Sequence, residues 1–321
     1  MKSLICGISG QDGAYLAQYL LSKGNDVWGT SRDANLGTFG NLRALGIFDK
    51  IKMVTMVPTD NHSVLDTIKS ILPDEIYFLA GQSSVALSFQ KPGETIEGIM
   101  LSVLNLLEAV RVIDMPIKIY NSSSSESFGN TPRTAANEET PFNPCSPYGI
   151  AKASAHWLVS NYRKSYGIYA CNGIMFNHES IFRPPGFVTR KIVSSACRIA
   201  KGSTDKLSLG RIDIVRDWGW APEYVEAMWL MLQQPTPDDF VIATGEANSL
   251  ESFVSFTFET LNLDWKKHVV LDSSLKRPSD ILWSQGDPRK AETLLGWKIS
   301  TSMHGVIKNM ISEEMRQLSK C

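Results

Sequence analysis

The chain has 321 residues, of which 43% are hydrophobic and 20% charged, the composition of a globular protein large enough for two lobes around a shared core. With 32 Lys and Arg against 33 Asp and Glu, the net charge of -1 excludes a long-range field that recruits nucleic acid or an acidic membrane. No uninterrupted apolar stretch approaches the roughly 20 residues of a membrane helix.

The cysteines are far apart in the sequence. They are Cys6, Cys145, Cys171, Cys197 and Cys321. They do not form the closely spaced pairs that bind zinc, and no secretory leader precedes Gly7. We therefore expect reduced thiols, no metal site and a cytoplasmic location.

The first elements are predicted to be a strand, a tight turn and a helix. Residues 3–6 form a strand-like run, glycines follow at positions 7, 10 and 13, and residues 14–23 have a helical periodicity that Gly24 ends. Strands are then predicted over 26–31, 51–55, 75–80 and 117–120, and helices over 62–72 and 98–113. This alternation predicts an α/β fold whose parallel sheet is doubly wound, with helices on both faces.

A proline-dense loop over residues 141–147 precedes the next predicted helix. No linker or low-complexity tract divides the chain, so we expect a second, smaller α/β lobe that is interwoven with the first. We predict a Rossmann-type dinucleotide-binding domain over 1–176, to which 214–245 returns. The substrate lobe is predicted over 177–213 and 246–321.

The glycines at 7, 10 and 13 have the spacing G-x-x-G-x-x-G between a strand and a helix. Such a turn lets backbone N–H groups approach a pyrophosphate at the N-terminus of the helix, whose dipole favours anions. Glycine turns also occur by chance, but the position after the first strand favours a dinucleotide.

Arg32 follows the second predicted strand and indicates which dinucleotide binds. A guanidinium at this position can pair with a 2′-phosphate, which favours NADP. Asp33 beside it weakens the argument, because an acid at this point prefers a free ribose diol. NAD therefore stays an alternative cofactor, and a solvated surface arginine is the structural alternative for Arg32.

Tyr148 and Lys152 are four residues apart, so a helix places both side chains on one face. A nearby cation stabilises a phenolate, which predicts a Tyr148 pKa lowered from about 10 toward the working range. Any helix can hold this pair by chance. Together with the glycine turn and Ser124, however, the pair resembles the serine, tyrosine and lysine set of the extended short-chain dehydrogenase/reductases.

A simple dehydrogenase has no use for Glu126, which lies two residues after Ser124. If Tyr148 takes the proton of a sugar 4-hydroxyl as hydride leaves C4, the new ketone acidifies the C5 hydrogen. A carboxylate can then remove that hydrogen and expel the 6-hydroxyl as water. Hydride returned to C6 completes a 6-deoxy-4-keto sugar. A helix N-cap or a surface salt bridge is the alternative role for Glu126.

Longer motifs resemble one family, the GDP-mannose 4,6-dehydratases. The similar segments are 10–13, 146–149, 160–167, 170–180, 187–192, 207–210, 216–219, 224–234 and 239–245. The resemblance implies a lyase that oxidises C4, loses water across C5 and C6 and returns hydride to C6, giving GDP-4-keto-6-deoxymannose.

The resemblance also implies roles for individual residues. The implied catalytic residues are Ser124, Ser125, Glu126, Tyr148 and Lys152. Ser124 would hydrogen-bond the 4-oxygen, and Ser125 with Glu126 would serve the C5 proton and the departing water. The implied cofactor-binding residues are Gly7, Gly10, Gln11, Asp12, Gly13, Arg32, Leu79, Ala80, Tyr148 and Lys152.

A third group of residues falls on positions that the family uses around GDP. These residues are Asn177, Val188, Lys191, Leu209, Gly210, Arg216 and Arg277. Arg216 and Arg277 fit this role chemically, because a guanidinium can hold diphosphate oxygens through two hydrogen bonds. Without the family, Arg216 and Asp217 read as a local ion pair, and Lys191 or Arg277 as solvated charges.

Departures from the family pattern leave several alternatives open. The family carries adjacent arginines and a serine-rich loop after the second strand, where this chain has Arg32 followed by Asp33. In the family this loop reaches the cofactor site of a neighbouring subunit. The difference therefore leaves open whether the predicted homo-oligomer is a dimer or a tetramer. Asp280 replaces a family glutamate, which leaves another GDP-hexose or a GDP-heptose as the substrate. A GDP-4-keto-6-deoxymannose reductase and a nucleotide-sugar-binding protein without turnover are the remaining alternatives.

Overall fold

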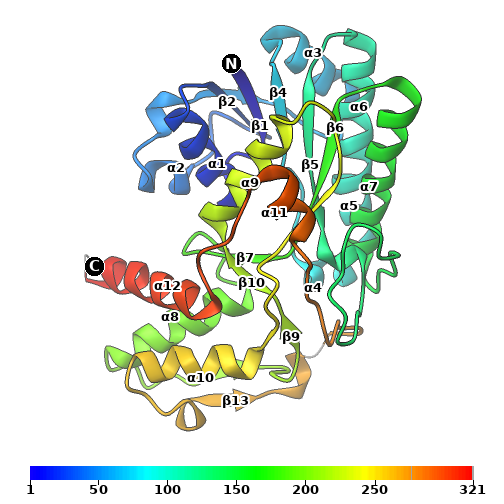
Figure 1. Cartoon of the computed structure of the whole chain (residues 1–321). Helices are drawn as coiled ribbons and strands as arrows, with labels where there is room; N and C mark the ends of the chain where they lie inside the picture. The colour runs from blue at the N-terminus through cyan, green and yellow to red at the C-terminus, as the bar shows by residue number, and fades with distance from the viewer. Residues whose placement is uncertain (276, 320–321) are drawn as a thin grey trace.

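Seven parallel strands form the central sheet of the computed structural model, which describes residues 1–275 and 277–319. Their order is β11-β6-β5-β4-β1-β2-β3, so the chain starts within the sheet and winds outward on both sides (Figure 1). The strands are β1 (Lys2–Cys6), β2 (Asp26–Ser31), β3 (Lys52–Thr55), β4 (Glu75–Phe78), β5 (Lys118–Ser124), β6 (Ala170–Met175) and β11 (Phe240–Ile242). The predicted doubly wound sheet is confirmed.

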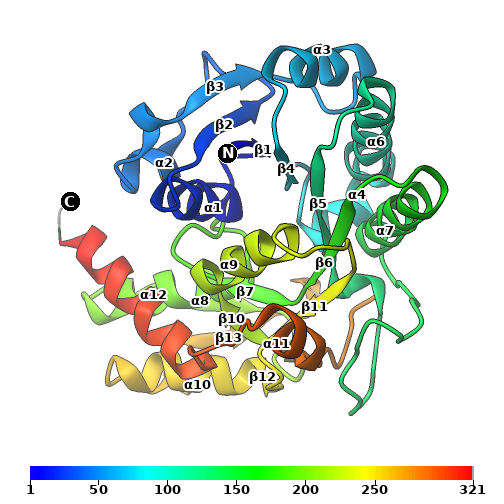
Figure 2. The same cartoon turned by 45° about the horizontal axis from the view of Figure 1, so that its top comes forward.

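Helices cover both faces of this sheet (Figure 2). One apolar layer joins the sheet to α1, α2, α9 and α11, and a second joins its other face to α3, α6 and α7. The bounds are α1 (Gln11–Ser22), α2 (Gly40–Ala44), α3 (Asn61–Ile71), α6 (Ser102–Ile113), α7 (Pro147–Tyr166), α9 (Ala221–Leu232) and α11 (Arg289–Leu295). Because both faces are buried, the strands are apolar on both sides, as parallel strands in such folds are.

The helix predicted over 98–113 is a regular α-helix only from Ser102 onward. Two short helices, α4 (Val85–Gln90) and α5 (Pro92–Ile96), lead into a π-helical turn over Glu97–Leu101. π-helical turns are rare and occur mostly as single turns within α-helices, so an analysis based on α-helical periodicity does not predict one. Glu97 and Gly98 in this turn face the cleft described below.

The second lobe has its own apolar core, formed mainly by α8, α10 and α12 at the bottom of Figure 1. Its helices are α8 (Val188–Ala200), α10 (Leu250–Thr260) and α12 (Met303–Leu318). Three two-stranded sheets pair β7 (Asn177–Glu179) with β10 (Trp218–Trp220), β9 (Val215–Arg216) with β12 (Asn248–Ser249), and β8 (Leu207–Leu209) with β13 (Val269–Leu271). The residue boundaries of the two lobes stay a prediction.

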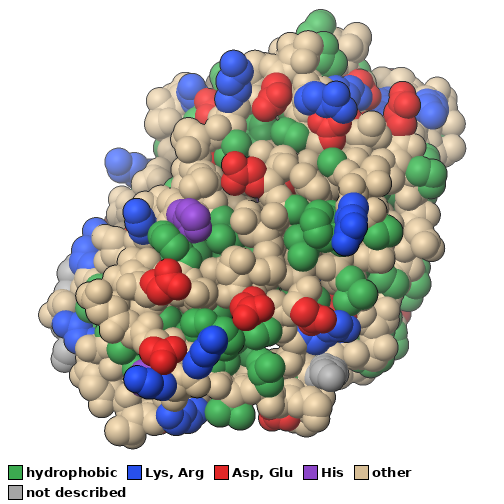
Figure 3. All heavy atoms as spheres, turned by 60° about the horizontal axis from the view of Figure 1, so that its bottom comes forward, with side chains coloured by type: hydrophobic (Ala, Val, Ile, Leu, Met, Phe, Trp, Pro, Cys, Tyr) green, Lys and Arg blue, Asp and Glu red, His purple; other side chains and the backbone are tan. Residues whose placement is uncertain are grey.

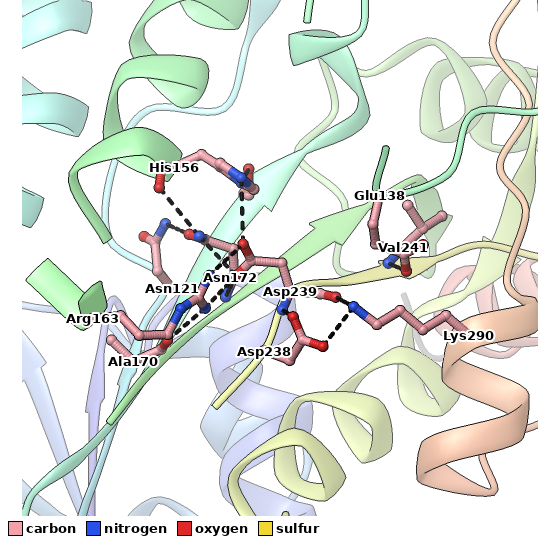
Figure 4. Close-up of polar contacts among 11 residues, drawn as sticks. Asn121, Glu138, His156, Arg163, Ala170, Asn172, Asp238, Asp239, Val241 and Lys290 are labelled. Carbon is pink, nitrogen blue, oxygen red and sulfur yellow. Dashed lines mark hydrogen bonds and ion pairs between the residues drawn. The ribbon is translucent and has the colours of Figure 1, made fainter. Parts of the chain in front are cut away.

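The edge strand β11 is held in place by polar side chains (Figure 4). The Asp239 carboxylate accepts two hydrogen bonds from Arg163, at 2.7 and 2.8 Å, and one from the Asn172 N–H at 2.9 Å. Burial alone would raise the pKa of Asp239, but Arg163 outweighs burial and lowers it. On the other side, the Glu138 carboxylate accepts the Val241 N–H at 2.7 Å. The last strand of the sheet is therefore anchored by the Arg163–Asp239 ion pair and by the Glu138 hydrogen bond, and burial raises the pKa of Glu138.

The surface carries no large area of one charge on the face in Figure 3, where acidic and basic side chains are interspersed. No helix in the described part of the chain is both long and apolar enough to cross a membrane. Cys6, Cys145, Cys171 and Cys197 are free thiols, and Cys321 lies outside the described residues.

Candidate active site

A cavity of about 870 Å³, called the cleft below, runs along the carboxyl ends of the central strands and reaches the second lobe. Ligands of open α/β sheets bind at this edge. The cleft brings together most residues singled out in the sequence: Gly7, Gly10, Gln11, Asp12, Gly13, Arg32, Leu79, Ala80, Ser124, Ser125, Glu126, Tyr148, Lys152, Asn177, Val188, Arg216 and Arg277.

Three of the residues assigned to the GDP moiety lie outside the lining of the cleft. Lys191 borders a neighbouring hollow of about 470 Å³, and its ammonium donates to the Ser208 carbonyl at 2.6 Å. Leu209 is buried in the core of the second lobe. Gly210 lies against the backbone of Leu275, so close that an added Cβ would be 3.0 Å from the Leu275 carbonyl oxygen.

At one end of the cleft, the turn after β1 leaves room for a ligand's phosphates. Gly10 is the N-cap residue of α1 and has no side chain to accept the free N–H groups of the first turn. A Cβ on Gly13 would lie 2.6 Å from the Gly7 carbonyl oxygen, so only glycine lets the helix approach the turn this closely. Uncapped N–H groups and the helix dipole together favour a bound anion.

Asp12 is the acidic residue of this turn. It is paired with His178, a contact that the sequence did not predict. His178 Nε2 lies 2.9 Å from an Asp12 carboxylate oxygen, and Nδ1 lies 2.7 Å from the Phe176 carbonyl oxygen. Burial opposes ionisation of Asp12, but the charge and hydrogen bond of His178 outweigh burial and hold the pKa of Asp12 far below its usual range. The paired carboxylate therefore repels a pyrophosphate less than a free one.

Arg32 lines the same end of the cleft and is exposed to solvent. Asp33 does not pair with it, because the Asp33 carboxylate accepts the N–H groups of Asn35 and Leu36, both at 2.9 Å. Among residues 1–275 and 277–319, no acidic side chain lies within ion-pair distance of Arg32. The guanidinium is thus available to an anionic ligand.

The middle of the cleft is formed where β5 ends and α7 begins. A 3-10 turn over Ser125–Ser127 follows β5, and the Ser124 hydroxyl accepts the Glu126 N–H at 3.2 Å. Ser146 caps α7 by accepting the Gly149 N–H at 3.0 Å. A Cβ on Gly149 would lie 2.7 Å from the Glu126 carbonyl oxygen, so this glycine lets the start of α7 pack directly on the turn.

Tyr148 and Lys152 share one face of α7, as predicted, but their electrostatics differ from the prediction. Burial and the negative charge of Glu126 raise the pKa of Tyr148 to about 12, against the opposing effect of a Ser124 hydrogen bond. The expected lowering by Lys152 is therefore wrong in this structure. The Lys152 ammonium lies 5.8 Å from the ring centroid and donates to the Ser122 carbonyl at 2.6 Å, while burial lowers its pKa to about 8.

Glu126 faces the cleft from the turn after β5. Within the described residues, its carboxylate makes no hydrogen bond or ion pair, so neither the N-cap nor the salt-bridge alternative describes it. Removal from bulk solvent raises the pKa of Glu126, and the positive charges of Arg216 and Arg277 oppose that rise. A carboxyl group tuned toward neutral pH is suited to give and take protons.

The far end of the cleft holds two arginines that share one carboxylate. Arg216, buried on β9, donates to Asp280 at 3.1 Å, and an Arg277 nitrogen lies 3.6 Å from the same oxygen. The local pair with Asp217 that the sequence left open is not formed by the Arg216 guanidinium, which also donates to the Val215 carbonyl at 2.9 Å. Two guanidiniums beside Glu126 give this end a positive charge that suits an anionic ligand.

Comparison with known proteins adds to this geometry. Residues 4–310 match a family model described as GDP-mannose 4,6 dehydratase. The chain belongs to the GDP-mannose 4,6-dehydratase family. It is 45% identical to GDP-mannose 4,6 dehydratase 2 of Arabidopsis thaliana, over 98% of this chain and 86% of that protein. It is 39% identical to the GDP-mannose 4,6 dehydratase of Homo sapiens, over 98% of this chain and 91% of that protein.

Solved structures of other enzymes support the fold of this GDP-mannose 4,6-dehydratase family member. A UDP-glucose 4-epimerase from Thermotoga maritima superimposes with a TM-score of 0.88 at 21% identity, over 99% of this chain and 100% of the other. A dTDP-glucose 4,6-dehydratase from Bacillus anthracis, in complex with NAD, has a TM-score of 0.85 at 19% identity, over 100% of this chain and 98% of the other.

Two further residues of this family member line the cleft although their roles were not assigned from the sequence. Arg183 lines the cleft and pairs with Glu179 at 3.0 Å, and Glu179 also accepts the Thr189 hydroxyl at 2.5 Å. His178 also borders the cleft, is buried, and stacks on Tyr224. The sequence offers no distinctive local signal for Glu179 or Arg183, since these are the only charged residues in the sequence of segment 177–183.

Proposed function

We propose that this chain is a 4,6-dehydratase that converts GDP-mannose to GDP-4-keto-6-deoxymannose with a recycled NADP. The single observation that supports it most is the meeting of Glu126 with Ser124, Tyr148 and Lys152 in one cleft, between two ends that suit anionic ligands. A dehydrogenase needs the last three residues alone. An additional carboxyl group with a raised pKa is what removal of a C5 proton requires.

The cofactor is proposed to lie at the end of the cleft formed by α1 and the turn before it. The uncapped first turn of α1 and the close approach at Gly13 fit a pyrophosphate, and Arg32 fits a 2′-phosphate. Gln11, Asp12, Leu79 and Ala80 border the same space. When bound, the nicotinamide supplies the acceptor and later the donor of the hydride.

Oxidation at C4 is proposed to depend on Tyr148. The phenolate of Tyr148, formed once the phenol has lost its own proton, takes the proton of the 4-hydroxyl while Ser124 holds the 4-oxygen. Tyr148 is protonated at neutral pH in this structure, because its pKa is raised to about 12. Lys152, with a pKa lowered to about 8, is the neighbouring group that can release a proton near neutral pH. The Tyr148 phenol therefore has to lose its proton before it can act as a base, and we expect this only when substrate and cofactor are bound.

Loss of water is proposed to depend on Glu126, assisted by Ser125. The carboxylate takes the C5 proton that the 4-ketone has acidified, and the carboxylic acid then protonates the departing 6-hydroxyl. No net proton is consumed, because the proton removed from C5 leaves with the hydroxyl as water. The raised pKa of Glu126 suits both halves of this exchange.

The GDP moiety is proposed to lie at the second-lobe end, with its diphosphate on Arg216 and Arg277. Both guanidiniums face the cleft, beside Asn177 and Val188. The proposal for the GDP moiety also includes Lys191, Leu209 and Gly210. Lys191 borders the neighbouring hollow, and Leu209 and Gly210 lie at the end of β8.

Association of copies and location are the last parts of the proposal. We propose a cytoplasmic homo-oligomer, supported by Ile150 and Trp157 on α7, whose side chains are 48% and 58% exposed although both are large and apolar. Light scattering of the purified protein measures the number of copies.

The function is tested by incubating the protein with GDP-mannose and a catalytic amount of NADP. The expected result is a product lighter by one water, with no accumulation of reduced cofactor. Reduced cofactor that accumulates in proportion to product indicates a dehydrogenase or reductase instead. If the folded, cofactor-loaded protein gives no product, GDP-mannose is not its substrate, and other GDP-hexoses and GDP-heptoses are tested in the same assay.

A further inference from the structure

The residue after Arg216 is a buried aspartate that the proposed reaction does not use. Asp217 lies between β9 and β10, and its side chain has no exposed surface. It does not line the cleft. A buried carboxylate next to a substrate-binding residue calls for a physical reason, because burying a charge is unfavourable.

The Asp217 carboxylate accepts hydrogen bonds from two distant segments of the chain. One oxygen accepts the Thr244 N–H at 2.9 Å and the Thr244 hydroxyl at 2.7 Å. The other accepts the N–H groups of Gly245 at 2.9 Å and of Gly286 at 3.5 Å. Thr244 and Gly245 follow β11, whereas Gly286 belongs to the extended segment 282–287. The Asp217 carboxylate therefore joins the residues that follow β11 to segment 282–287.

Asp217 holds these segments without a cation. Among residues 1–275 and 277–319, no Lys or Arg forms an ion pair with it, in contrast to Asp239, which Arg163 neutralises (Figure 4). Burial raises the pKa of Asp217 to about 6, although the four donors oppose the rise. The folded pKa lies above the ordinary value, so the group favours the fold at low pH and this contribution is lost as pH rises through about 6. At neutral pH the ionised Asp217 is therefore less favourable to the fold than its protonated form.

The backbone around Arg216 is paired on both sides with segments that adjoin the Asp217 partners. Arg216 pairs with Asn248 of β12 on one side. On the other side, the preceding residue Val215 donates to the Leu282 carbonyl at 2.8 Å and accepts the Ser284 N–H at 3.1 Å. Segment 282–287 is thus part of the frame around Arg216, and Asp217 holds it through Gly286.

We propose that Asp217 is a positioning residue, whose carboxylate fixes the backbone of Arg216 and segment 282–287 so that the Arg216 guanidinium meets the diphosphate of a bound GDP-sugar. The inference rests on the proposed function, in which Arg216 binds that diphosphate. A guanidinium gives two parallel hydrogen bonds to phosphate oxygens only when its stem is held in the right place. Asp217 supplies that constraint from outside the cleft.

The test measures binding of GDP and of guanosine to the full chain loaded with cofactor, by titration calorimetry. Arg216→Gln is expected to weaken GDP at least about tenfold and to leave guanosine unchanged, because a charged hydrogen bond to phosphate is lost. Asp217→Asn places an amide NH₂ against the N–H donors and is expected to weaken GDP about fivefold, again without an effect on guanosine. In the double variant, Asp217→Asn is expected to add nothing to Arg216→Gln, because both act through one guanidinium.

Two controls separate positioning from general loss of structure. Asp239→Asn removes another buried carboxylate, and it is expected to lower the melting temperature while GDP affinity stays within about twofold of the wild type. Thr244→Val removes one donor to Asp217 and is expected to weaken GDP about twofold, whereas Thr244→Ser keeps the hydroxyl and is expected to bind like the wild type. In turnover, Asp217→Asn is expected to raise KM for GDP-mannose and to keep kcat, because the diphosphate does not react.

The outcomes distinguish this inference from the proposed function. If Arg216→Gln leaves GDP affinity unchanged, the diphosphate assignment fails and the inference fails with it. If Arg216→Gln weakens GDP but Asp217→Asn does not, only the inference fails. It also fails if the two effects add in the double variant, or if Asp239→Asn weakens GDP as much as Asp217→Asn does. Should Asp217→Asn not fold, the difference between Thr244→Val and Thr244→Ser decides in its place.

Discussion

The two ends of the cleft are built from different parts of the chain. The end proposed for the cofactor is a backbone surface, made by the turn over residues 7–13 and the first turn of α1, and its one carboxylate, Asp12, is paired with His178. The end proposed for the sugar nucleotide is a set of charged side chains, Glu126, Arg216 and Arg277, with Asp280 shared between the arginines. The effects of substitutions should therefore be independent of one another at the cofactor end. At the sugar-nucleotide end, the effect of one substitution should depend on which other charged side chains are present.

Tyr148 lies where the two ends meet, and its replacement is expected to have the largest effect. Tyr148→Phe removes the group that takes the 4-hydroxyl proton, so oxidation and everything after it should fall by about 10³-fold. Single-turnover absorbance of the reduced nicotinamide measures this step. GDP affinity serves as the control and should not change. Cofactor reduction at the wild-type rate would overturn the assignment of Tyr148 at both ends.

Glu126→Gln is expected to separate the chemistry of the two ends. Oxidation at C4 should persist, while removal of the C5 proton falls by about 10²- to 10⁴-fold. In a single turnover, reduced cofactor and a 4-keto sugar that retains its 6-hydroxyl should accumulate. Exchange of the C5 hydrogen with deuterated water measures the lost step directly. Full dehydration by this variant would show that another group is the base.

Arg32→Ala tests the independence of the cofactor end. NADP affinity should fall by about tenfold or more, because a charge-assisted contact to the 2′-phosphate is lost, while NAD affinity stays the same. Fluorescence titration with both cofactors gives the ratio. GDP affinity is the control, since within the described part of the chain Arg32 forms no ion pair with a residue of the other end. Equal loss for NADP and NAD would mean that Arg32 does not read the 2′-phosphate.

The smallest expected effect is on the pH profile, and it tests the dependence among charges at the sugar end. Glu126 must be ionised to take the C5 proton, so kcat/KM should fall as pH falls through its raised pKa. Arg277 opposes that rise, so Arg277→Gln should raise the Glu126 pKa further and move the fall to higher pH. On the acid side this lowers relative activity by about threefold. Arg32→Ala is the matched control, and its profile should keep the wild-type shape.

The same contrast explains how much could be predicted from the sequence. The turn after β1 and the pairing of Tyr148 with Lys152 are local, so spacing and helical periodicity were enough to predict that each set shares one surface. The contact between Arg216 and Asp280 joins residues 64 apart in sequence, and the one between His178 and Asp12 joins residues 166 apart. Helix and strand periodicity relate only residues that are close in sequence, so they do not predict these contacts. Only folding of the second lobe against the sheet reveals them.

The Tyr148 pKa marks a different limit of sequence reasoning. Spacing predicts correctly that Lys152 is near, but not that burial and Glu126 dominate the electrostatics. Burial depends on everything packed around α7, including the turn that Gly149 allows to approach. A pair of residue types therefore predicts a neighbour, whereas the direction of a pKa shift needs the surrounding structure.

The polar side chains along β11 also affect how molecules of this protein meet. β11 ends the central sheet, and a bare sheet edge can accept a strand from another chain, the first step of aggregation. The Glu138 side chain already accepts the Val241 N–H at 2.7 Å, so an incoming strand has to displace this hydrogen bond. This guard discourages growth of the sheet from copy to copy.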